Sequence, residues 1–136
     1  DCRVAPTSRT PLEILLHLGD LLEWGERMAR GETRWQPGPA LPWDEARERF
    51  FADLAALDRA LAELPAEGLP VEIVFQGPIA DALTHVGQLA LLRGVFGSPV
   101  RPESYARAEI QIGRTGPHQA APRQEFSGDA SAKRPG

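Results

Sequence analysis

The stretch that most clearly indicates the fold is "WDEARERFFADLAALDRALAEL", residues 43–64. Large apolar side chains recur in it every three or four residues, and Asp, Glu and Arg fill the opposite face. Acidic residues follow its first position, where the helix dipole favours negative charge. The pattern predicts one bundle helix that begins near Pro42 and ends before Pro65. Its apolar positions are Trp43, Phe50, Leu54, Leu57, Leu61 and Leu64.

The preceding segment, residues 10–31, has the same period and a clear start. Thr10 can cap the helix, Pro11 suits its first position, and Glu13 can complete a capping box by reaching back to the Thr10 amide. Gly31 is the expected end. The inward-facing positions are Ile14, Leu15, Leu18, Leu21, Leu22 and Met28. Between these two helices, the Pro- and Gly-rich residues 35–42 predict a connection.

Two further helices are predicted after residue 70. One begins at Gly77-Pro78 and ends between Gly94 and Gly97, and a short one covers residues 102–113. "VEIVF", residues 71–75, is interpreted as an extended connector, with a very short strand as the alternative.

These elements predict an all-α fold, an antiparallel up-and-down helical bundle formed by residues 1–113. Residues 114–136 contain no Leu, Ile or Val and only one aromatic residue. Such a segment cannot bury enough apolar area to offset its ordering entropy, so it is predicted to be a flexible Gly/Pro/Ala-rich tail or an arm lying on a partner.

Composition excludes several classes of function. The net charge of −4, with scattered basic residues, argues against a nucleic-acid partner. Cys2 is the only cysteine, so neither an intrachain disulfide nor a four-cysteine zinc site can form. No apolar run is long enough to cross a membrane, and no signal-peptide pattern opens the chain. We therefore expect a cytoplasmic protein with no membrane partner.

Polar residues interrupt the apolar stretch "IADALTHVGQLALLRG", residues 79–94. Asp81 and His85 are four residues apart, so they share a helix face, and His17 borders the apolar stripe of the first helix. If these helices are neighbours, the three side chains can converge on one point. Two imidazoles and a carboxylate suit zinc, nickel or iron. The alternative is a simple Asp81–His85 helix ion pair, with His17 a separate core histidine.

Three segments resemble the DinB-like (YfiT-like) metal-binding superfamily of four-helix bundles. They are "LLHLGDLLEW" (15–24), "DALTHVGQLALLRG" (81–94) and "PESYARAEIQIGRTGPHQ" (102–119). The family's metal site usually consists of three histidines from separate helices. The resemblance implies that His17 and His85 are ligands. Asp81 occupies the position of the family's other histidine and would bind the ion through oxygen.

The resemblance also implies thiol-dependent chemistry on a small molecule. Known activities of the superfamily include transfer of a low-molecular-weight thiol to an electrophile and thiol-assisted isomerisation. We expect such a thiol to arrive as a cosubstrate, because Cys2 lies at a loose terminus. Gln88, one turn beyond His85, can orient a ligand or face solvent. The sequence therefore predicts a metal-dependent thiol S-transferase, or alternatively a metal-free bundle that binds a small ligand or a partner subunit.

The family has a further long helix before the one at residues 11–30, and the sequence begins too late to contain it. Either an N-terminal part is missing from the sequence, or the remaining helices leave an apolar face uncovered. Such a face favours a homodimer, with Trp24, Trp35 and Phe51 as candidate contacts.

Overall fold

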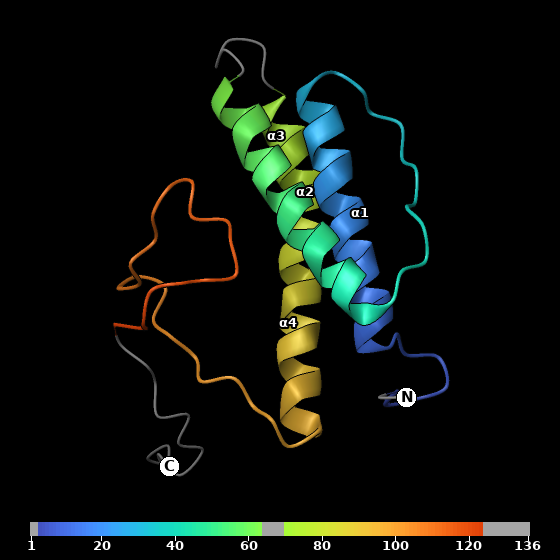
Figure 1. The fold of residues 1–136 in the computed structure, drawn as a ribbon, viewed down its shortest axis with the longest axis vertical. Coiled ribbons are helices and arrows are strands. Elements are labelled where there is room, and N and C mark those ends of the chain that lie inside the picture. The colour runs from blue at the N-terminus through green and yellow to red at the C-terminus, as the bar shows by residue number, and fades with distance from the viewer. Residues whose placement is uncertain (1–2, 64–69, 124–136) are drawn as a thin grey trace, which may run out of the picture.

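The computed structural model describes residues 3–63 and 70–123, which form three helical rods (Figure 1). In chain order, these are α1 (Pro11–Ala29), α2 (Trp43–Glu63) and a rod made of α3 (Val71–Val74), a π-helical turn (Phe75–Ile79) and α4 (Ala80–Val95). There is no β-strand in these ranges, so the all-α prediction is confirmed for them. Nor do they contain a helix long and apolar enough to span a bilayer.

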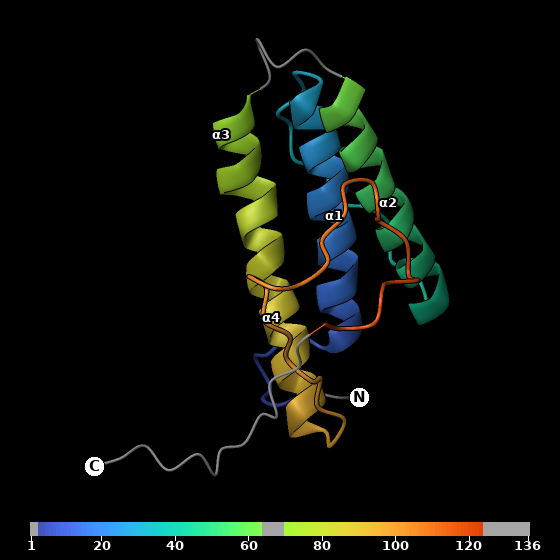
Figure 2. The ribbon, with the colours of Figure 1, turned by 90° about the vertical axis from the view of Figure 1, so that its left-hand side faces the viewer.

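Helix α1 is the central rod, with α2 on one side and α4 on the other (Figure 2). The predicted capping box is present: the Glu13 amide donates to Oγ1 of Thr10 at 3.2 Å, and the Thr10 amide donates to Oε2 of Glu13 at 2.6 Å. Gly31 follows the helix with φ of +90°, a conformation that favours glycine. Every residue of the predicted inward stripe is buried. The end of α4 is also as predicted, since Gly97 has φ of +77°.

The prediction of an antiparallel arrangement was wrong for α1 and α2, which run in the same direction (Figure 1). The start of α2 lies beside the start of α1, and Leu57, further along α2, packs against Leu22 and Met28 near the end of α1. This is possible because residues 30–42 run back along α1. A 19-residue helix is about 28 Å long. Residues 30–42, when extended, span up to about 40 Å, which is enough to return to the start of α1.

Helix α2 buries only part of its predicted apolar stripe. Leu57 is fully buried, while Phe50, Leu54 and Leu61 are partly buried against the core. Trp43 was wrongly placed in the core: it is 48% exposed, at the rim of an open groove. Leu64 lies outside the described residues.

Residues 71–79 are helical and not an extended connector, and Gly77-Pro78 is not the start of the helix, which corrects two predictions. The helix begins at Val71 and passes through Gly77 and Pro78 without interruption. Proline lacks an amide proton and crowds the preceding turn, and the wider π-helical turn accommodates both effects. Packing stabilises this arrangement, because Val74 and Pro78 are buried and Val74 contacts the core of α1 and α2.

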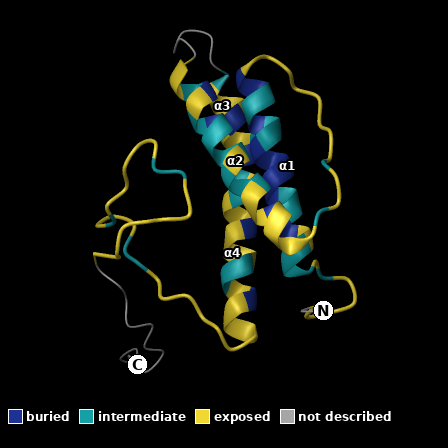
Figure 3. Ribbon diagram, in the orientation of Figure 1, coloured by how far each residue is buried: buried dark blue, intermediate teal, exposed yellow. Residues whose placement is uncertain are grey.

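The predicted fourth helix at residues 102–113 is absent. This segment forms turns and irregular backbone (Figure 3). Its largest side chains remain in solvent: Tyr105 is 84% exposed, Ile110 79% and Ile112 100%. A helix of this length is marginal in water unless it packs an apolar face. Residues 114–123 are also non-helical, and the rest of the tail lies outside the described residues.

An apolar groove separates α2 from α4, which do not pack against each other. Two adjoining cavities of about 500 and 320 Å³ form it, and both are lined by Leu18, Phe50 and Val86. The described residues therefore leave an apolar face open, and Phe51 lies on it. Trp24, by contrast, packs on the core and donates its indole N–H to the Thr33 carbonyl at 2.9 Å, so it contacts its own chain. The homodimer stays a prediction.

A charged cluster fixes residues 30–42 against α1. The guanidinium of Arg49 lies 2.8 Å from Asp20, 2.8 Å from Glu23 and 3.2 Å from Asp53. The Gly38 amide donates to Oδ1 of Asp20 at 3.0 Å. The Arg49 guanidinium lies so close to Gly38 that a Cβ there would stand 2.4 Å from Nη1. A side chain at Gly38 would therefore push the Arg49 guanidinium out of its place in the cluster.

This cluster predicts a pH-dependent effect of Asp53→Asn. Burial, aided by Glu23 and Asp20 and opposed by Arg49, raises the pKa of Asp53 from 3.8 to about 6. The folded state therefore binds this proton more tightly than the unfolded state. The ionised carboxylate thus lowers stability above a pH of about 6, and the loss is relieved as the pH falls towards 3.8. The variant should be more stable than the wild type by about 1–3 kcal/mol near pH 8 and equal to it near pH 4.

Urea denaturation of both proteins across this pH range measures the difference. Asp44→Asn, at an exposed position of the same helix, is the control and should show no such trend. If the stability gained by Asp53→Asn grew as the pH falls, it would contradict the raised pKa of Asp53.

Close packing at Gly25 predicts that Gly25→Val destabilises the fold. A Cβ at this position would lie 3.2 Å from Cγ of Pro78 and 3.4 Å from Leu57. The larger side chain should lower the free energy of unfolding by about 1–3 kcal/mol through overpacking. Gly87→Val is the matched control, because a Cβ there meets nothing within 4 Å. Chemical denaturation that finds the two variants equally stable would contradict this account.

Candidate metal centre

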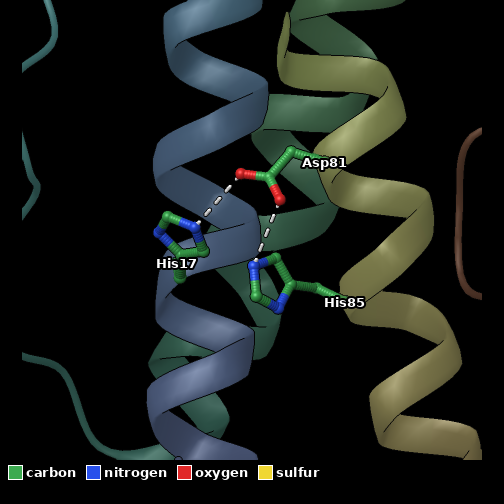
Figure 4. A group of neighbouring side chains, drawn as sticks. All are labelled: His17, Asp81 and His85. Carbon is green, nitrogen blue, oxygen red and sulfur yellow. Dashed lines mark ion pairs between the residues drawn. The ribbon is translucent and has the colours of Figure 1, made fainter.

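The three side chains selected from the sequence meet between α1 and α4 (Figure 4). His17 comes from α1, and Asp81 and His85 come from successive turns of α4. Nε2 of His17 lies 3.6 Å from Oδ2 of Asp81, and Nε2 of His85 lies 3.4 Å from Oδ1. One potential ligand atom from each residue lies within 4.8 Å of the others.

These separations suit an ion better than a direct contact. A charge-assisted hydrogen bond between imidazole and carboxylate has a length of about 2.7–2.9 Å, shorter than either distance here. Two ligands of a tetrahedral zinc ion, each at about 2.0–2.1 Å, stand about 3.3–3.4 Å apart. Each histidine thus faces a different oxygen of the carboxylate, at 3.4 or 3.6 Å, which is close to the separation of two ligands of one ion.

Gln88 orients the ring of His85. Its amide oxygen lies 2.8 Å from Nδ1 of His85. Because an amide oxygen can only accept, Nδ1 carries the proton and Nε2 keeps its lone pair for a ligand on the Asp81 side. The sequence left open whether Gln88 contacts His85 or faces solvent: the residue is exposed, yet its amide group contacts His85.

His17 is held in its neutral form. Partial burial lowers its pKa below the usual 6.5, and the positive charge of Arg9 and the neighbouring His85 act in the same direction, while Asp81 opposes them. The His85 ring stands edge-on at 4.7 Å between centroids, and the Trp35 ring lies at 5.7 Å on another side. A neutral imidazole is the form that binds metal, so His17 needs no costly deprotonation at neutral pH.

The site opens to solvent on one side. His85 is buried and His17 partly buried, but the Asp81 side chain is 48% exposed. A pocket of about 660 Å³ reaches all three residues and is also lined by Gln88. A three-ligand site at the base of an open pocket leaves coordination positions for a small molecule, as catalytic sites do and structural ones do not.

Arg9 also reaches the site, although it was not among the residues predicted for it. Its Nη1 lies 3.4 Å from Nε2 of His85, and this is the ring nitrogen that also faces Asp81. The segment before α1 folds back through an ion pair of 2.8 Å between Arg3 and Glu13 and a turn closed by Ser8 and Ala5. No local pattern signals this approach, because 76 residues separate Arg9 from His85.

Comparison of the chain with protein-family models, with curated proteins and with solved structures gave no match. Any account of its function therefore depends on the site itself.

Proposed function

We propose that this chain is a DinB-like protein in which His17, Asp81 and His85 hold a divalent metal ion, zinc or nickel in preference to iron. The observation that carries the proposal is the spacing of the three side chains, with carboxylate oxygens 3.4 and 3.6 Å from the imidazole nitrogens. Two nitrogen ligands and one oxygen ligand suit these borderline ions.

The proposed activity is a thiol-dependent reaction, an S-transferase or a related enzyme acting on a small molecule. A divalent ion lowers the pKa of a nearby thiol and so supplies the reactive thiolate near neutral pH. The residues of this chain supply the rest: Gln88 fixes the His85 ring, and the open pocket admits the reactants. Cys2 lies outside the described residues, and the thiol in this proposal comes from a small cosubstrate.

The apolar groove between α2 and α4 favours a second candidate, a metal-free bundle that binds an apolar small ligand or a partner subunit. Leu83 is 63% exposed and Val86 48% exposed along it, which is unusual for large aliphatic side chains that line one continuous surface. This function does not require His17, Asp81 and His85 to bind a metal ion.

Metal content separates the two candidates. The chain is purified without a His-tag, and its metal is measured by mass spectrometry for the wild type, His85→Ala and His118→Ala. His118 is the matched control, an exposed histidine outside the cluster. We expect about one ion per chain in the wild type and the control, and none in His85→Ala.

Thermal unfolding provides the second measurement, because a ligand selective for the folded state raises its stability. Zinc or nickel should raise the Tm of the wild type and of His118→Ala but not of His85→Ala. A wild type that holds no metal and shows no shift with either ion would leave only the second candidate.

A further inference from the structure

We propose that Arg9 binds the carboxylate of an acidic thiol cosubstrate beside the metal centre, so that the site selects thiols carrying a negative charge. The inference rests on the proposed function, since it assumes an ion on His17, Asp81 and His85. It assigns a substrate class and a specificity-determining residue to that site.

Arg9 lies beside the candidate metal centre. Its guanidinium lies 3.4 Å from Nε2 of His85, and no ion pair joins it to a carboxylate among residues 3–63 and 70–123. The imidazole lone pair cannot serve both an ion and an arginine. When His85 binds an ion, the guanidinium therefore loses this acceptor, and Arg9 stays in the lining of the pocket.

The charge of the loaded site also favours an acidic ligand. A divalent ion and the carboxylate of Asp81 together carry a net charge of about +1, because both histidines bind as neutral ligands. The guanidinium of Arg9 adds another positive charge close to it. A bound thiolate neutralises the charge at the ion, so the guanidinium of Arg9 is the positive charge that remains for the carboxylate of the same ligand.

The chemistry of the pocket suits a ligand with a carboxylate and a short apolar chain. Arginine binds carboxylates through paired, charge-assisted hydrogen bonds, and Thr7 adds a hydroxyl to the same lining. Ile14, Leu91 and Leu92 form an apolar wall beside these polar groups. A short chain with a thiol at one end and a carboxylate at the other matches this combination of a metal site, an apolar wall and an arginine.

The test uses the cobalt(II)-loaded protein, because the visible absorption of cobalt reports exchange of its ligands. The protein is titrated with 3-mercaptopropionate and with 3-mercaptopropionamide, which has the same length and no charge. The wild type should bind the acid about tenfold more tightly than the amide, as a charge-assisted hydrogen bond would give. Arg9→Gln should bind both thiols equally well.

Arg47→Gln is the matched control, since Arg47 is an exposed arginine on the groove side of α2. It should keep the preference for the acid, which separates the local effect of Arg9 from a change in net charge. If Arg9→Gln binds cobalt and retains the preference of the wild type, the inference is overturned while the metal site stands. If the wild type binds no cobalt, the proposed function is overturned and the inference with it.

Discussion

Arg49→Met should lower the free energy of unfolding by about 3–5 kcal/mol, the usual cost of removing one partner from a buried charge cluster. The guanidinium is only 15% exposed, and Asp20, Glu23 and Asp53 lie around it. Without it, three carboxylates face one another with no cation between them. The substitution should also loosen residues 30–42, because Asp20 accepts the Gly38 amide. Equilibrium urea denaturation measures the loss.

Arg47→Met is the matched control on the same helix. Its guanidinium is 57% exposed and stands 3.8 Å from Asp44, so its removal should cost less than about 1 kcal/mol. Restoring part of the stability of Arg49→Met by adding Asp53→Asn would show that repulsion among the carboxylates causes the loss. A loss below 1 kcal/mol for Arg49→Met would contradict the role assigned to this cluster.

His85→Ala should weaken zinc binding by more than about 100-fold, because it removes one of three ligands, and even outer partners of ligands are worth about 10–100-fold. Gln88→Ala leaves all three ligands in place but frees the His85 ring, and it should weaken zinc binding by about tenfold. Competition with a chromophoric chelator measures both dissociation constants.

The order of the two effects is the informative result. Gln111→Ala, which removes an exposed amide from the irregular segment, should leave the dissociation constant unchanged. If Gln88→Ala behaved like this control, the ring of His85 would not depend on Gln88 for its orientation. If His85→Ala also left the dissociation constant for zinc unchanged, zinc would be bound elsewhere.

The parts of the fold that were predictable depend on local physics. The capping box of Thr10 and Glu13 and the buried stripe of α1 need only neighbouring residues, and all are present. Residues 71–79 were misjudged because Gly77 and Pro78 are strong local signals for a break. Burial of Val74 and Pro78 against the other helices outweighed those signals, and the π-helical turn accommodated the proline.

Tertiary relationships were less accessible. The hydrophobic period of a helix does not encode the direction in which the helix runs. The residues of the connection, 35–42, did not indicate that α2 runs parallel to α1 either. The convergence of His17 with Asp81 and His85 was predictable because it needed only that two helices be neighbours. The approach of Arg9 depends on how a non-helical segment folds back over α1, which no period or cap reports.

The central claim is that His17, Asp81 and His85 bind one ion together. X-ray absorption of the zinc-loaded protein at the zinc edge tests it most directly. The account predicts the outer-shell scattering of two imidazole rings, further oxygen or nitrogen neighbours at about 2.0–2.2 Å, and no sulfur. A spectrum without imidazole scattering, or with a sulfur ligand from Cys2, would contradict it.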